Sequence, residues 1–193
     1  MLKTKLAAGA LVFSTLFIGA VPAYAANVTQ TTGTPGMPTV TLTVPGALSE
    51  DERASLLFMR EEEKLAHDVY VTLYDQWGLR VFNNIAASEQ KHTDAIAALL
   101  NAYGLTDPTI GNGVGEFTNP DLQALYDELV AQGSASVTEA LKVGVAIEEL
   151  DITDLEQRIA ETDSSDIQRV YSNLLAGSTN HLRAFSSNLS RHS

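Results

Sequence analysis

Apolar residues recur at spacings of three and four positions along four long stretches of the chain. This is the pattern of amphipathic helices, each of which turns one apolar stripe towards a core. The four predicted helices cover residues 49–77, 81–103, 136–161 and about 164–190. Within 49–190 no segment alternates apolar and polar residues as a strand does, so the pattern predicts an all-α fold.

Residues typical of helix ends support these bounds. The first and third helices each begin with a serine that is followed three positions later by a glutamate, the spacing of a capping box. The first two helices each end at a glycine. The residues are Ser49 with Glu52, Ser136 with Glu139, Gly78 and Gly104.

The connections predict how the helices are joined. A Gly-rich loop (104–119) and a short helix (120–132) separate the second and third long helices, with Asn119 as the cap and Pro120 at the first helical position. Only short links join the first helix to the second and the third to the fourth. Two hairpins with one long crossover are the connectivity of a ferritin-like four-helix bundle, here predicted for residues 49–190.

The N-terminal region has a different pattern. Residues 1–25 combine a basic start, an apolar run (6–21) and an Ala-Tyr-Ala site, which together predict a signal peptide cleaved after Ala25. The run is too short for a stable transmembrane helix, so no membrane span is expected after cleavage. Residues 26–48, rich in Thr, Pro and Gly, are predicted to be a flexible linker, and the mature chain is expected to be exported.

Composition narrows the function classes. The chain has no cysteine, which excludes disulfides and thiolate metal sites. Its net charge is −12, and it becomes −14 once the two lysines of the signal segment are removed. Such an acidic chain is not expected to bind nucleic acid or anionic lipid through a basic patch. Nothing in the sequence predicts an oligomeric state.

The second helix carries two ionisable residues within its apolar stripe. Glu89 and His92 lie one turn apart, between Ile85 and Ile96. A single histidine on such a face is usually a core histidine with a hydrogen-bond partner. A glutamate one turn earlier changes the interpretation, because two buried ionisable groups need partners or a metal ion.

The other helices repeat this feature. On the first helix the apolar face favours Glu62 slightly over Glu63, whereas Glu61 points away and a solvated glutamate triplet is the competing interpretation. The third helix places two carboxylates one turn apart in its stripe, with Glu149 outside it, and the fourth places a histidine there. These residues are Glu148, Asp151 and His181.

Burying such a set at mid-length in four helices without a cation would be costly. A divalent metal ion offsets that cost, and carboxylate and imidazole ligands suit iron, manganese or zinc. The sequence therefore predicts a metal site in the core.

Two segments of the chain resemble known ferritin-like proteins. Residues 62–70 resemble the first-helix signature of ferritin-like proteins: in rubrerythrins and bacterioferritins a ligand glutamate is followed by alanine at +3 and tyrosine at +7. Glu63, Ala66 and Tyr70 match that frame, and residues 88–96 are similar to the second-helix Glu-x-x-His motif of these proteins.

More closely, residues 49–190 resemble an exported ferritin-like family of uncharacterised proteins called DUF2202. That family carries Glu-Glu-x-Leu-Ala-x-Asp-Val-Tyr, Ser-Glu-x-x-His and a late Asn-His-Leu-Arg-Ala-Phe, which stands here at 180–185. The resemblance implies a ferritin-like fold. Its frame selects Glu63 as the first-helix ligand and leaves Glu62 as the second choice.

One position departs from the di-iron pattern. That pattern has a glutamate three residues before the last histidine, and Ser178 stands there. Asp151 is a candidate for the missing carboxylate. The alternatives are a single metal, an asymmetric pair, or no metal.

Two functions follow as hypotheses. The first is a metal-binding protein that acts as a di-iron oxidase or peroxidase on iron or peroxide, with Tyr70 as a hydrogen-bond donor or electron source. Its metal ligands would be Glu63, Glu89, His92, Glu148 and His181, with Glu62 and Asp151 in reserve. The second is a non-enzymatic exported bundle that binds a protein or envelope partner, its core polar residues forming a hydrogen-bond network.

Overall fold

The structure is a computed structural model that describes residues 47–192. Its helices are α1 (Glu50–Trp77), α2 (Arg80–Ala102), α3 (Pro120–Gly133), α4 (Val137–Glu161) and α5 (Ser165–His192). The described residues contain no strand, which confirms the all-α prediction. The predicted signal segment 1–25, and the predicted linker up to residue 46, lie outside the described residues.

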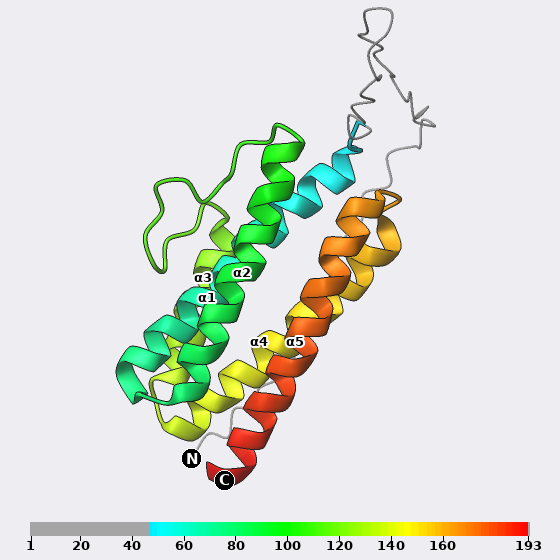
Figure 1. The fold of residues 1–193 in the computed structure, drawn as a ribbon. Helices are drawn as coiled ribbons and strands as arrows, with labels where there is room; N and C mark the ends of the chain where they lie inside the picture. The colour runs from blue at the N-terminus through cyan, green and yellow to red at the C-terminus, as the bar shows by residue number, and fades with distance from the viewer. Residues whose placement is uncertain (1–46, 193) are drawn as a thin grey trace, which may run out of the picture.

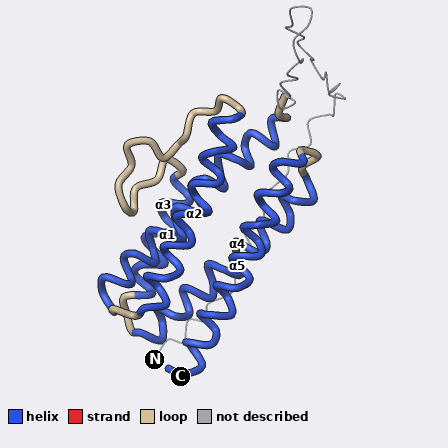
Figure 2. Tube along the Cα trace, in the orientation of Figure 1, coloured by secondary structure: helices blue, strands red, loops and turns tan. Residues whose placement is uncertain are grey.

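The long helices form two antiparallel pairs (Figure 1). α1 packs along α2, α4 packs along α5, and the two pairs contact each other through α1 with α4 and α2 with α5. A long loop leads from α2 to α3, and α3 packs against α1 and α4 (Figure 2). Among the described helices, none is long and apolar enough to span a membrane.

The helix ends follow the predicted residues, with one exception. Ser49 and Glu52 form a complete capping box at the start of α1. Gly78, which ends α1, has a φ of 67° and so adopts the left-handed conformation that glycine tolerates best. At the start of α4 the predicted box is only half formed: Ser136 accepts from the amide of Glu139, but the Glu139 carboxylate accepts from Gln132 and Lys142 instead.

The apolar core has two separate halves. One half surrounds three aromatic rings, Tyr70, Phe82 and Phe185, and the other includes Met59 and Tyr171. On each long helix the polar residues predicted for the core lie in sequence between the residues of the two halves. The bundle therefore encloses a polar layer near mid-length.

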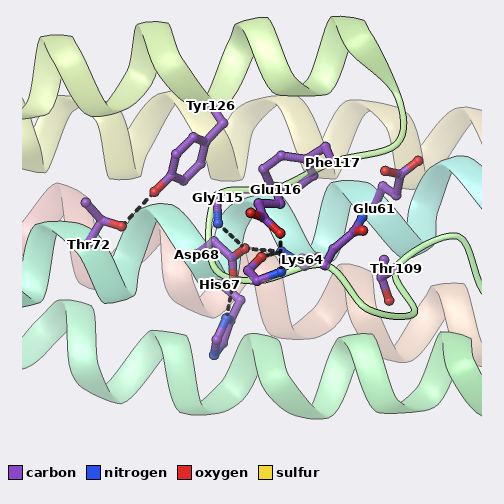
Figure 3. A network of polar contacts seen from close by, with 12 residues as sticks. Glu61, Lys64, His67, Asp68, Thr72, Thr109, Gly115, Glu116, Phe117 and Tyr126 are labelled. Atoms are coloured by element: carbon purple, nitrogen blue, oxygen red, sulfur yellow. Dashed lines mark hydrogen bonds and ion pairs between the residues drawn. The ribbon is translucent and has the colours of Figure 1, made fainter.

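The crossover is fixed to α1 by two buried carboxylates. Asp68 accepts from Lys64, from the amide of Gly115 and from His67 (Figure 3). Glu61 accepts from the amide of Asn119, at 3.0 Å, and from that of the residue before it. The competing interpretation of the glutamate triplet as a solvated face is therefore wrong. Glu61 points away from the polar layer, as predicted, but it is buried under the crossover because that loop folds back over α1.

Candidate metal centre

The polar layer brings together residues from four helices. Glu63 of α1, Glu89 and His92 of α2, Glu148 of α4 and His181 of α5 are all buried, and the three glutamates are each 1% exposed. Helical spacing explains their direction, because each residue shares an apolar stripe with core neighbours one turn away. Five ionisable side chains thus meet where little water can reach them.

The first group of ligand atoms comes from α1 and α2. Nδ1 of His92 lies 3.2 Å from Oε2 of Glu63 and 2.8 Å from Oε2 of Glu89. These three residues each offer one ligand atom within 4.8 Å of the others. The group has the size and composition of half a carboxylate–histidine metal site.

The second group repeats the first on the other helix pair. Nδ1 of His181 lies 2.7 Å from Oε1 of Glu89 and 3.5 Å from Oε2 of Glu148. Glu89 therefore belongs to both groups and turns one oxygen towards each imidazole. The two imidazole rings stack on each other, with centroids 5.4 Å apart. A shared carboxylate between two matched groups is the arrangement of a ligand that bridges two metal ions.

Most of these atoms approach one another as ion pairs between carboxylates and imidazoles. Oε1 of Glu63 is buried and has no hydrogen-bond partner. Leaving a buried polar atom unpaired costs about 1–3 kcal/mol, and more for a charged group. Three carboxylates and two imidazoles that converge in this way offer oxygen and nitrogen donors to a shared cation, so the residues present fit a transition-metal ion.

The pKa values of these groups show which of them hold protons near neutral pH. Burial raises the pKa of Glu63 to about 8 and that of Glu148 to about 7. Burial alone would lower the pKa values of the histidines, but the carboxylates raise that of His92 to about 11 and that of His181 to about 9. Both imidazoles are then protonated at neutral pH. A metal ion must displace protons before it can bind here.

Neighbouring groups orient the ligands. Tyr70 donates a hydrogen bond to Oε1 of Glu148 at 2.7 Å, and the Ser88 hydroxyl lies 2.9 Å from Nε2 of His181. A Cβ at Gly177 would stand 2.6 Å from Nε2 of His92, so the absence of a side chain there makes room for the ring. Such contacts fix which nitrogen faces the centre.

The two reserve ligands lie beside the centre and outside both groups. Burial and the charge of Glu63 raise the pKa of Asp151, whose Oδ1 has no hydrogen-bond partner. Ser178, at the position of the missing glutamate, is fully buried and donates to the carbonyl of Leu174. Burial and the charges of Asp151 and Asp154 raise the pKa of Glu62. The structure thus places Glu63 in the first group and Glu62 outside it.

Sequence reasoning missed three residues around this layer. Ser88 and Gly177 contact the far side of the imidazoles, and Asp154 lies next to Glu62. The local pattern carried a signal for Ser88, which directly precedes Glu89. For Gly177 and Asp154 the relevant neighbours are on other helices, and no spacing along the chain reveals them.

Comparisons with known proteins agree on a family. Residues 52–193 match the family model described as "Uncharacterized protein domain (DUF2202)". The uncharacterized protein MJ0754 of Methanocaldococcus jannaschii is 54% identical over 138 residues, which cover 72% of this chain and 75% of that protein.

Solved structures give the same relationship. The crystal structure of hypothetical protein MJ0754 matches with a TM-score of 0.74 and 48% identity, over 83% of this chain and 87% of that one. A DUF305 fragment from Deinococcus radiodurans matches with a TM-score of 0.58 at 15% identity, over 74% of this chain and 97% of that one, and shows a likeness of fold alone. The chain belongs to the DUF2202 family.

Proposed function

We propose that this protein is an exported metal-binding protein of the ferritin-like kind, whose polar layer holds two divalent transition-metal ions. The observation that carries the proposal is the position of Glu89. Each of its oxygens faces the Nδ1 atom of one histidine, at 2.8 Å for His92 and 2.7 Å for His181, so one carboxylate joins the two groups. A carboxylate shared in this way suits a bridge between two ions, which would take the place of the imidazole protons.

The ligands divide between two ions. Glu63 and His92 would hold one ion, Glu148 and His181 the other, and Glu89 both. These donors suit iron first, and also manganese or zinc. Asp151 supports this assignment as an additional ligand, because its unpaired oxygen is buried beside the position where the second bridging glutamate is missing.

The ferritin-like assignment rests on connectivity and ligand spacing. Two helical hairpins with one long crossover, and a Glu-x-x-His ligand pair on α2, are features of the di-iron carboxylate bundles. Export rests on the signal-like residues 1–25. Mass spectrometry of secreted protein should find Ala26 as its first residue, and recovery of an intact Met1 would contradict export.

Iron would supply the chemistry of an oxidase or peroxidase, in which iron(II) is oxidised while dioxygen or peroxide is reduced. The protein's own residues hold and shield the site. Tyr70 donates a hydrogen bond to Glu148 and so keeps that carboxylate turned inward. The two apolar halves of the core keep bulk water away from the ligands.

The test of metal binding is a titration of metal-free protein with iron(II), manganese(II) and zinc(II), together with metal analysis of protein purified without added metal. We expect two ions per chain for the wild type and loss of most bound metal in Glu89→Ala and His92→Ala. Glu149→Gln is the matched control, because Glu149 is exposed on α4 and touches neither group. No uptake at micromolar concentrations would favour the non-enzymatic bundle instead.

Catalysis needs a separate measurement. After iron(II)-loaded protein is mixed with oxygen or peroxide, stopped-flow absorbance should show faster oxidation than in His92→Ala. Equal rates would reject the oxidase or peroxidase activity and would leave metal binding to be judged by the titration.

A further inference from the structure

Glu62 is a buried carboxylate that the proposed centre does not use. It is 4% exposed, and neither of its oxygens has a hydrogen-bond partner. Its neighbour Glu61, buried to the same extent, is paired with two backbone amides. The crossover therefore explains the burial of Glu61 but not that of Glu62, whose polar neighbours are Asp151, Asp154 and Arg158.

The groups around Glu62 connect it to the centre. Burial and the negative charges of Asp151 and Asp154 raise the pKa of Glu62. Asp151 in turn experiences the charges of Glu63 and Glu89. Asp154 and Asp151 are one turn apart on α4, and both are near enough to Glu62 of α1 for their charges to act on it, while Asp151 is also near the ligand groups.

Asp154 also belongs to a surface pocket between α1 and α4. It lines the pocket together with Asp51, Glu61 and Glu161. Among the lining residues within the described part of the chain, Arg158 is the only basic one, and its guanidinium lies 4.6 Å above the ring of Phe58. A cleft lined mainly by one sign of charge concentrates ions of the opposite sign and raises their association rate.

We propose that Asp154, Glu62 and Asp151 form an accessory cation site that passes divalent metal ions from this pocket to the centre. The proposal rests on the proposed function, because it names the route by which that centre is filled. Glu62 is the middle position, where an ion loses its contact with the pocket before it reaches the ligands. Its unpaired oxygens are the groups that would hold the ion there.

A purely structural role for Glu62 is less consistent with these observations. Structural buried carboxylates accept from amides or from a lysine, as Glu61 and Asp68 do. The charge of Arg158 favours the ionised form of Glu62, whereas burial and the charges of Asp151 and Asp154 oppose it. A carboxylate next to two others, with one arginine, resembles a site that a cation completes.

The experiment follows cobalt(II), whose visible absorbance reports its ligands and which oxygen does not readily oxidise when it is bound by oxygen and nitrogen donors. Metal-free full chain is mixed with cobalt(II) in a stopped-flow instrument, and the final stoichiometry is measured by titration. Glu62→Gln should reach the wild-type absorbance and stoichiometry about tenfold more slowly, in line with the rates that charge focusing contributes. Asp154→Asn should also slow loading, by a smaller factor.

Glu156→Gln is the matched control, because Glu156 is an exposed residue of α4 that does not line the pocket. It should load at the wild-type rate. Wild-type loading rates in Glu62→Gln would overturn the route, and so would a lower final stoichiometry, which would make Glu62 a ligand of the centre itself. If circular dichroism shows that Glu62→Gln is unfolded, Asp154→Asn provides the test by itself. Cobalt loading at the wild-type rate in that variant would then overturn the route. Failure of the wild type to bind cobalt would reject the centre, and with it the route.

Discussion

The carboxylates that anchor the crossover and those of the polar layer are buried almost equally, yet their partners differ. Asp68 is 2% exposed and its oxygens meet a lysine, a histidine and a backbone amide. Glu89 is 1% exposed, and its oxygens meet the Nδ1 atoms of two histidines, His92 at 2.8 Å and His181 at 2.7 Å. Asp68 lies on α1 and Glu89 on the neighbouring α2.

The pKa values separate Asp68 from Glu63 but not from Glu89, because burial of Glu89 is outweighed by its two neighbouring imidazoles, which lower its pKa to about 2. His67, Lys64 and the amide of Gly115 outweigh burial and lower the pKa of Asp68. Burial raises the pKa of Glu63 to about 8. The crossover site is thus complete without a further charge, whereas the polar layer is completed by protons or by metal ions. The kind of partner, rather than depth of burial, separates the two: Asp68 meets a lysine and a backbone amide, whereas Glu63 and Glu89 meet imidazoles.

The largest expected effect compares one amide substitution in each region. Asp68→Asn leaves Lys64 with the carbonyl of Gly113 but without its carboxylate partner, and breaking a buried pair costs up to roughly 3–5 kcal/mol of unfolding free energy. Glu63→Gln in the metal-free protein removes a carboxylate that burial disfavours, so its unfolding free energy should be unchanged or higher. Urea unfolding measures both. An equal loss in the two variants would remove the distinction between the regions.

The second prediction concerns pH. Glu63 and Glu148 have pKa values raised to about 8 and about 7, so the folded metal-free protein keeps protons that the unfolded chain has lost. Their contribution to stability therefore falls as pH rises from about 4.5 to about 8. His181 and His92 extend this loss of stability to higher pH. Their carboxylate neighbours raise their pKa values from 6.5 to about 9 and about 11, so the stability that they add below pH 6.5 is lost as pH rises through those two values.

Metal affinity should depend on pH in the opposite direction to this stability. Each ion displaces protons from the ligands, so affinity should rise with pH and protons should be released on binding. An indicator dye in weakly buffered solution measures the release. The crossover should behave differently: Asp68, with its lowered pKa, adds stability above the unfolded value of 3.8 that is lost as pH falls through its lower folded value. Metal uptake without proton release would contradict the assignment of the ligands.

The third prediction uses two glycines of the bundle. Alanine at Gly177 would place a methyl group against the ring of His92, and displacing a ligand's support typically weakens metal affinity about 10–100-fold. Gly144→Ala is the control, because its methyl group would meet Phe185 in the apolar core, 2.5 Å from the nearest ring atom. It should lower stability and leave the number of bound ions unchanged. Thermal melts and metal titrations separate the two outcomes.

The smallest expected effect is that of Tyr70→Phe. The change removes one hydrogen bond to Glu148 and keeps the ring in the core, which should cost about 1 kcal/mol of unfolding free energy. Metal affinity should fall by no more than about tenfold, because Glu148 keeps its position but loses one contact that orients it. Unchanged affinity and stability would show that Tyr70 does not orient Glu148.

Part of the candidate site could be predicted from the spacing of residues within single helices. Glu89 and His92 were expected on one face because helical periodicity places residues three apart on the same side. The choice between Glu62 and Glu63 was different. Both fall on the buried face of α1, and periodicity along one helix does not say which neighbours each will meet.

The sequence by itself determined the helices, most of their ends, and a polar layer at mid-length, because these depend on interactions between residues a few positions apart. Only the tertiary structure decided that Glu63 meets His92, that Glu62 meets Asp154, and that Glu61 anchors the crossover. Those outcomes depend on how whole helices and a long loop pack together. Such packing joins positions far apart in the chain, and no local pattern encodes it.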